Sequence, residues 1–185
     1  MCRRKAVFCV LSAVGLIVLL GGVGIAEEPP LYGIGRPATE REIKAWDIDV
    51  DPSGAGLPPG RGTVPQGAAV YAAKCAACHG PTGTEGPQNR LVGGHGSLAT
   101  GRPTKTIGSY WPYATTLYDY IYRAMPLTAP QSLTPDEVYA VVAWLLHQNQ
   151  IIPADAVIDA RTIPDVTMPN RKGFVSDPRP DVLLR

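Results

Sequence analysis

The residues that could carry chemistry stand together in one run, Cys75-Ala76-Ala77-Cys78-His79. Two thiols three positions apart lie on one helical turn, where each can add to one of the two vinyl groups of a haem. The histidine that follows can place its imidazole under the iron as the proximal ligand. This run is the attachment signature of a c-type haem, so we predict one covalently attached haem c held by Cys75, Cys78 and His79.

Two other kinds of site use a Cys-x-x-Cys pair. A redox motif of the thioredoxin type requires a βαβ context, whereas the flanks here are helical and rich in Gly and Pro. A structural zinc site needs four ligands, and the remaining cysteines, Cys2 and Cys9, lie in a leader that we expect to be removed. No second Cys-x-x-Cys-His run occurs in the sequence, which limits the chain to one haem.

The sixth position of the iron needs another side chain, for which the chain offers four candidates. Met125 is followed by proline and closes a predicted helix. Ligation by His and Met is typical of electron-transfer haems, so we predict that Met125 is the distal ligand. Met168, His95 and His147 are the other candidates, and an iron left open at this position is a further alternative.

The polar edge of the haem and the proximal imidazole also need partners. We predict that the backbone carbonyl of Pro87 accepts a hydrogen bond from the second nitrogen of His79. Trp111 and Tyr113 are predicted donors to the haem propionates, because buried N–H and O–H groups need partners. The alternative is that both rings only pack around the cofactor. We predict no catalytic residue in this chain.

Helices are predicted to position these residues. Capping boxes mark three helix starts, at Thr39–Glu42, Thr63–Gln66 and Thr134–Glu137. The second of these helices, residues 66–74, delivers the thiols at its end. A further helix, about residues 115–124, carries an apolar stripe and ends at Met125 because the next residue, Pro126, cannot continue it.

The chain is predicted to have four segments. They are a signal peptide (1–26), an N-terminal extension (27–63), a monohaem domain (64–150) and an extended C-terminal tail (151–185). The leader combines the basic run Arg3-Arg4-Lys5, an uncharged stretch and a small-x-small site at Gly24-Ile25-Ala26, which predicts export and cleavage. An uncleaved membrane anchor is the alternative, since about 20 apolar residues can span a bilayer.

The charge balance and the apolar content limit the kinds of partner that the chain can have. Without its leader the chain keeps 14 of its 17 basic residues, because three lie in residues 1–26, against 16 acidic ones. No basic face emerges, which argues against a nucleic-acid partner. The tail is rich in large apolar residues and broken by prolines, so we expect it to lie extended on a surface, either that of the haem domain alone or one shared with a partner.

From Gly67 to His147 the sequence resembles the class I cytochrome c fold. The positions that carry the resemblance are Gly67, Tyr71, the attachment run, Gly86-Pro87, Met125-Pro126, Val141 and Trp144. The resemblance implies an all-α domain whose first and last helices cross, here with long irregular N- and C-terminal extensions.

A narrower resemblance covers most of the chain after its leader. The stretches 32–37, 45–50, 105–115 and 168–170 are similar to the cytochrome subunit of bacterial sulfane dehydrogenase. That family belongs to the Sox sulfur-oxidation system and to related sulfite dehydrogenases. In it, a molybdenum subunit oxidises the sulfur substrate and the cytochrome accepts its electrons. Some members carry two haems, whereas this chain has one attachment site.

This resemblance implies a periplasmic electron-transfer subunit that is not an enzyme on its own. Its electron donor would be a molybdenum-cofactor dehydrogenase subunit, and its acceptor a downstream cytochrome or oxidase. Two alternatives stay open. One is a free electron shuttle for another dehydrogenase or oxidase, and the other is a haem enzyme or sensor with an open iron.

Overall fold

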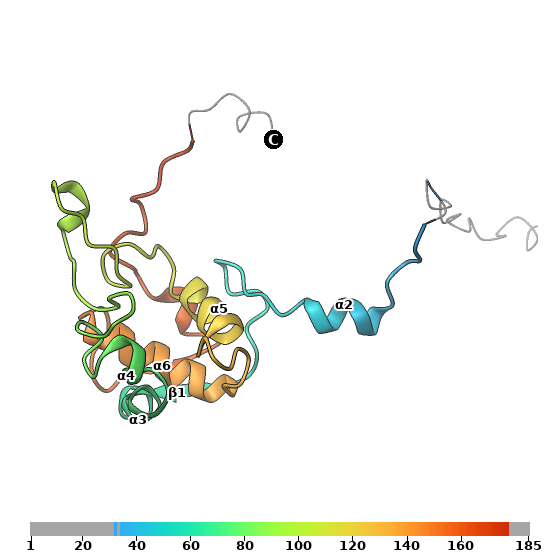
Figure 1. The fold of residues 1–185 in the computed structure, drawn as a ribbon, viewed down its shortest axis with the longest axis horizontal. Helices are drawn as coiled ribbons and strands as arrows, with labels where there is room; N and C mark the ends of the chain where they lie inside the picture. The colour runs from blue at the N-terminus through green and yellow to red at the C-terminus, as the bar shows by residue number, and fades with distance from the viewer. Residues whose placement is uncertain (1–31, 33, 178–185) are drawn as a thin grey trace, which may run out of the picture. The chain divides into compact units, whose positions relative to one another are not determined.

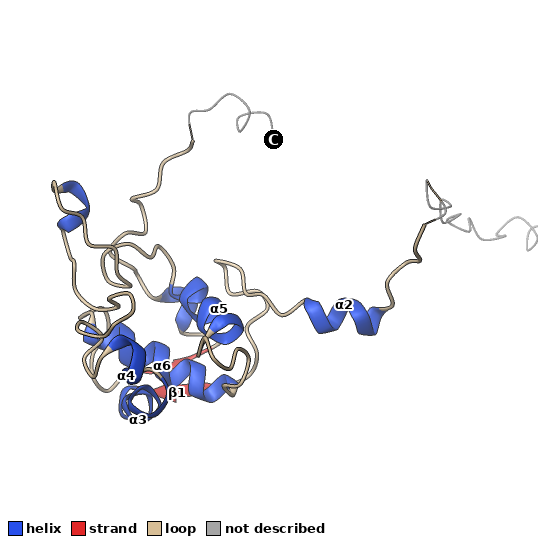
Figure 2. Ribbon diagram, in the orientation of Figure 1, coloured by secondary structure: helices blue, strands red, loops and turns tan. Residues whose placement is uncertain are grey.

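The computed structural model describes residues 32 and 34–177 (Figures 1 and 2). The predicted signal peptide and residues 178–185 lie outside the described residues. The chain divides into two units, residues 1–42 and 43–185. The helices are α2 (Glu40–Trp46), α3 (Val64–Lys74), α4 (Ala76–His79), α5 (Ala114–Ala124) and α6 (Pro135–Gln148), with 3₁₀ turns η2 (Ser97–Ala99) and η3 (Ile163–Asp165).

The predicted helical class is confirmed. Within residues 32 and 34–177, extended structure is limited to two short strands, β1 (Arg61–Thr63) and β2 (Val157–Asp159), which pair antiparallel. Long irregular segments lie between α4 and α5 and beyond α6, shown in tan in Figure 2. Among the described residues, no helix is long and apolar enough to cross a membrane.

The three predicted capping boxes are present. Thr63 accepts from the Gln66 backbone N–H, and its own N–H donates to the Gln66 side chain at 2.9 Å. Thr134 and Glu137 form the same pair at the start of α6, with a backbone-to-carboxylate distance of 3.0 Å. Each box satisfies N–H groups that the first helical turn leaves unpaired.

At the start of α2 the N–H of Thr39 donates to the Glu42 carboxylate at 2.9 Å. Arg36 also pairs with Glu42, and this contact lowers the pKa of that carboxyl to about 2. None of the seven residues of α2 is buried, and Trp46 is 86% exposed. The short helix is therefore stabilised by its cap rather than by packing.

The core forms where α3 crosses α6 (Figure 1). A Cβ placed on Gly67 would lie 1.9 Å from the carbonyl oxygen of Ala140, so the two helices approach to backbone contact and only glycine fits. One turn along α3, the rings of Tyr71 and Trp144 stack at 3.9 Å. These contacts confirm the crossing that the resemblance implied.

The C-terminal tail contributes to this core. Gly62 of β1 pairs with Ile158 of β2, and Ile158 is 3% exposed. Further along the tail, Ile163 is 0% and Met168 1% exposed. The segment up to Met168 therefore lies against the haem domain, which is the domain part of the surface that we expected for the tail.

Beyond Asn170 the tail becomes exposed. Phe174 is 52% and Val175 90% exposed. The apolar residues Val182, Leu183 and Leu184 lie outside the described residues.

Ile163 tests whether the tail belongs to the domain. Ile163→Ala should lower the free energy of unfolding by about 2–5 kcal/mol, because a fully buried side chain leaves a cavity. Val175→Ala, at an exposed site, should change it by less than about 0.5 kcal/mol. Urea unfolding followed by circular dichroism measures both, and equal small effects would show that the tail does not stabilise the domain.

Candidate functional site

Cys75, Cys78 and His79 lie on one turn of helix. Cys75 ends α3 and caps α4, and its carbonyl accepts from the backbone N–H groups of Cys78 and His79, each at 3.1 Å. No disulfide joins these two thiols, and Cys75 is half-buried whereas Cys78 is exposed. The two sulfurs and the imidazole therefore emerge from a single turn, as haem attachment requires.

The setting of Cys75 does not suit a redox dithiol. Burial raises the pKa of the Cys75 thiol to about 11, with a small opposing effect of Lys74. Reactive dithiols of the thioredoxin class depend instead on a lowered thiol pKa. The flanking elements are the helices α3 and α4 rather than a βαβ unit. Both observations argue against the thioredoxin-type alternative.

The proximal imidazole is oriented by a backbone carbonyl. Nδ1 of His79 lies 2.9 Å from the carbonyl oxygen of Asn89. Because a carbonyl can only accept, Nδ1 carries the proton, and Nε2 keeps the lone pair that a metal binds. This donor set fits a haem iron.

The acceptor differs from the one predicted. We expected the carbonyl of Pro87, whereas the structure places that of Asn89 against the ring. The backbone N–H of Gln88 donates to the carbonyl of Cys78 at 2.9 Å, which turns the chain back toward α4 just after Pro87. The next carbonyl that faces His79 therefore belongs to Asn89.

Two close contacts hold the loop that follows His79 against α4. A Cβ on Gly86 would lie 2.3 Å from both the carbonyl oxygen of Cys78 and the carbonyl carbon of His79. The hydroxyl of Tyr71, on α3, donates to the carbonyl of Gly80, the residue that follows α4, at 2.9 Å. Burial raises the pKa of Tyr71 to about 12, so this hydroxyl keeps its proton at physiological pH. The core crossing and the attachment turn are thus directly connected.

Asn149 holds the next part of the loop, and the sequence analysis missed it. This residue is 1% exposed. Its Oδ1 accepts from the N–H of Gly93 at 3.0 Å, and its Nδ2 donates to the carbonyls of Leu145 and Leu91 at 2.9 and 3.2 Å. The one available signal was a polar residue directly after a strongly apolar helix.

Two hydroxyl side chains hold the last part of the irregular segment between α4 and α5. Thr106 and Ser109 are both buried. Ser109 donates to the carbonyl of Thr104 at 2.6 Å and accepts from the N–H of Thr106 at 2.9 Å, while Thr106 donates to the carbonyl of Gly93. Since buried backbone groups need partners, these side chains let an irregular segment pack without strands or helices.

Met125 and its competitors have different surroundings. Met125 ends α5, is half-buried and packs against the edge of the core. Met168 is 1% exposed and enclosed by the core. His95 is exposed, and Nδ1 of His147 lies 3.2 Å from the carbonyl of Ile152.

Trp111 and Tyr113 lie just before α5 and are both half-buried. The Trp111 ring meets Tyr120 edge to face at 5.7 Å. The guanidinium carbon of Arg171 lies 4.1 Å from the centre of the Tyr113 ring. Neither the indole N–H nor the phenol O–H has a hydrogen-bond partner in the described part of the chain.

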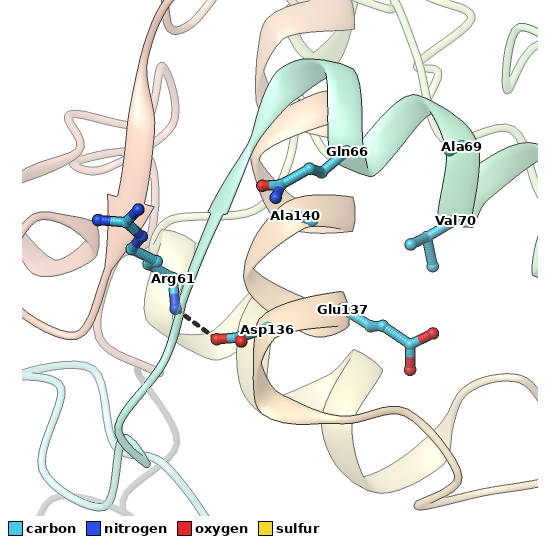
Figure 3. Close-up of a pocket in the computed structure, with 7 residues that line it drawn as sticks. All are labelled: Arg61, Gln66, Ala69, Val70, Asp136, Glu137 and Ala140. Atoms are coloured by element: carbon cyan, nitrogen blue, oxygen red, sulfur yellow. Dashed lines mark hydrogen bonds between the residues drawn. The ribbon is translucent and has the colours of Figure 1, made fainter.

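A separate groove lies between α3 and the start of α6 (Figure 3). Its volume is about 360 Å³, and its lining residues are Arg61, Gln66, Ala69, Val70, Asp136, Glu137 and Ala140. The backbone N–H of Arg61 donates to Asp136 at 2.8 Å, and Lys74 pairs with Glu137 at 2.6 Å. None of the predicted site residues lines this groove, and its carboxylates already have partners within the chain.

Comparison with known proteins identifies a matching family model and a similar solved structure. Residues 62–145 match the family model described as cytochrome C oxidase, cbb3-type, subunit III. A chain in the crystal structure of the sulfane dehydrogenase SoxCD from Paracoccus pantotrophus is 46% identical, with a TM-score of 0.75. That match covers 80% of this chain and 73% of the other. A search of curated proteins found no match.

Gly86 offers a test of the loop at the attachment turn. Gly86→Ala should lower the free energy of unfolding by about 1–3 kcal/mol, because the new methyl group collides with backbone atoms that cannot rotate away. Gly101→Ala is the matched control, since nothing lies within 4 Å of its Cβ position. Urea unfolding measures the free energy of unfolding of both variants. Equal values for the two variants would show that the loop does not pack against α4.

Proposed function

The chain belongs to the class I c-type cytochromes and resembles the cytochrome subunit of bacterial sulfane dehydrogenase, and from this premise we propose its role. It is a periplasmic monohaem subunit that accepts electrons from a molybdenum sulfane or sulfite dehydrogenase subunit and passes them to a downstream cytochrome or oxidase. The observation that carries the proposal is the turn that presents Cys75, Cys78 and Nε2 of His79 together, in a chain 46% identical to one in SoxCD.

Each residue of the attachment turn has a defined task. Cys75 and Cys78 bind one haem c through thioether bonds, and His79 supplies Nε2 to the iron. The carbonyl of Asn89 accepts a hydrogen bond from Nδ1 of His79 and so orients the imidazole ring. When bound, the haem supplies one-electron redox chemistry at its iron. The protein contributes the ligands and their orientation, and no residue acts as an acid, base or nucleophile.

Met125 is the distal ligand in this proposal. Its side chain sits at the end of α5 and at the edge of the core, so it can reach a metal with little rearrangement. Met168 would first have to leave the core, because its side chain is 1% exposed. His95 and His147 are less suited, the first for its exposed loop and the second for its contact with Ile152.

Trp111 and Tyr113 donate to the haem propionates in this proposal. Both polar groups lack partners within the described residues, and both residues precede the helix that ends at Met125. Pro87 retains a role in shaping the loop below the haem, although Asn89 accepts the imidazole proton.

The length of the match supports a subunit over a free shuttle. Eighty per cent of the 185 residues is about 148, whereas only 124 residues lie from Gly62 onward (185 less 61), so at least about 24 matched residues precede the haem domain. A free shuttle has no need of this shared extension. Within it, α2 exposes Ile43 and Trp46, two apolar side chains three positions apart. We propose that these residues and the tail beyond Phe174 contact the dehydrogenase subunit.

The segments before and after the domain complete the proposal. Residues 1–26 direct export and are removed, 27–63 form the N-terminal extension, 64–150 bind the haem, and 151–185 form the tail. Export fits covalent haem attachment, because the reduced thiols are joined to haem outside the cytoplasm. An anchor in place of the cleaved leader would keep the same domain at the membrane surface.

The distal ligand can be tested with two methionine variants. Met125→Leu should abolish the sulfur-to-iron charge-transfer band of the oxidised protein and lower the reduction potential, because a thioether favours reduced iron. Met168→Leu should keep the band. Acid–acetone extraction should leave the haem on the polypeptide in both variants, since Cys75 and Cys78 hold it covalently. The reverse pattern of bands would assign the ligand to Met168.

The partner can be tested by co-expression with the molybdenum subunit of a bacterial sulfane or sulfite dehydrogenase. The two proteins should co-purify, and sulfite or a sulfane-sulfur compound should reduce the haem only when the dehydrogenase is present. Absorbance of the reduced haem measures this transfer. Reduction by unrelated donors without co-purification would favour the free shuttle, and carbon monoxide binding to the wild-type haem would favour the open-iron enzyme or sensor.

A further inference from the structure

We propose that the C-terminal tail carries a residue that tunes the haem, Arg171, whose guanidinium offsets the charge of a haem propionate and raises the reduction potential. The residues involved are 168–174, here called the clasp. This inference rests on the proposed haem site, because it places the clasp at the propionate edge through Tyr113.

The clasp is fixed against the segment before α5. Met168 anchors one end in the core, with 1% of its surface exposed. Nδ2 of Asn170 donates to the carbonyl of Tyr110 at 2.7 Å. Phe174 meets the Tyr110 ring edge to face at 5.3 Å. The clasp is therefore held on both sides of Arg171.

These contacts give Arg171 a defined position despite its exposure. Its backbone N–H donates to the carbonyl of Met168 at 3.1 Å, which closes a turn. The turn places the guanidinium carbon 4.1 Å from the centre of the Tyr113 ring, within the range of a cation–π contact. An exposed arginine on a mobile tail would have no such fixed place.

The charge of Arg171 is available to a ligand. In the described part of the chain Arg171 pairs with no carboxylate, whereas Arg36, Arg123 and Lys74 all do. A guanidinium stacked on a ring keeps its edge N–H groups directed outward, and their fork geometry matches a carboxylate. The propionates of a haem are carboxylates of this kind.

Tyr113 connects this cation to the cofactor. Tyr113 caps α5, and Met125 ends the same helix. The phenol O–H of Tyr113 has no partner within residues 32 and 34–177. A propionate that accepts from this hydroxyl would lie beside the ring that Arg171 covers, so one group could receive both contacts.

The expected effect on the iron follows from electrostatics. Oxidised haem iron carries one more positive charge than reduced iron, so a nearby cation destabilises the oxidised state. Pairing with a propionate acts in the same direction, because it removes a negative charge that would stabilise oxidised iron. Loss of Arg171 should therefore lower the midpoint potential.

The test compares two neutral substitutions of neighbouring cations in the full chain with its haem. Arg171→Gln should lower the midpoint potential by clearly more than Lys172→Gln, which removes the same charge from an exposed residue without a ring contact. Arg171→Lys should recover part of the loss. Equal shifts for Arg171→Gln and Lys172→Gln would overturn the inference, because they would report a general surface charge.

A third variant separates position from charge. Asn170→Ala removes the hydrogen bond to Tyr110 and leaves every charge in place. The potential should still fall, since Arg171 loses its fixed place. An unchanged potential would contradict the clasp. If the wild type carries no covalent haem, the proposed function fails, whereas a normal His/Met spectrum with an unresponsive Arg171 refutes only this inference.

Discussion

The structure depends on how closely two helices remote in sequence approach each other. At Gly67 the backbone of α3 meets the backbone of α6, and a methyl group would already collide with Ala140. This approach lets Tyr71 stack on Trp144 and send its hydroxyl to the carbonyl of Gly80 at the end of α4. The direction in which the attachment turn presents its side chains therefore follows from a helix contact on its far side.

Around that turn, neutral amides and hydroxyls satisfy many backbone groups of the chain, and the carboxylate of Glu85 accepts from the N–H groups of Thr82 and Thr84. Asn149 and Ser109 each satisfy several backbone groups of the irregular loop, and such buried networks fix a conformation because any unpaired member is costly. Tyr118 is an exception. Its hydroxyl is buried without a partner among the described residues, and burial raises its pKa, so it behaves mainly as an aromatic ring against Tyr139. Charged pairs remain at the surface, where they add little stability.

Structural features that depend only on residues close together in the sequence can be predicted from it. Helix starts are predictable because a capping box spans three positions, and the attachment turn because its spacing is itself the signal. The acceptor for His79 was assigned to Pro87 instead of Asn89, since the carbonyl that faces the ring depends on the path of the whole loop. The burial of Ile163 was hidden for a related reason. A segment broken by prolines has no periodicity from which a buried face could be read.

The pairing of β1 with β2 has a consequence for how the protein is made. Arg61 lies just before α3 and its partner Asp159 comes after α6, so the two strands meet only when most of the polypeptide has been synthesised. Contacts between such distant positions form late, because the intervening chain must first be ordered. The Cys75–His79 turn is therefore synthesised well before its domain can close. Until β2 pairs with β1 the two thiols stay accessible, so the order of residues along the chain leaves an interval in which both can react.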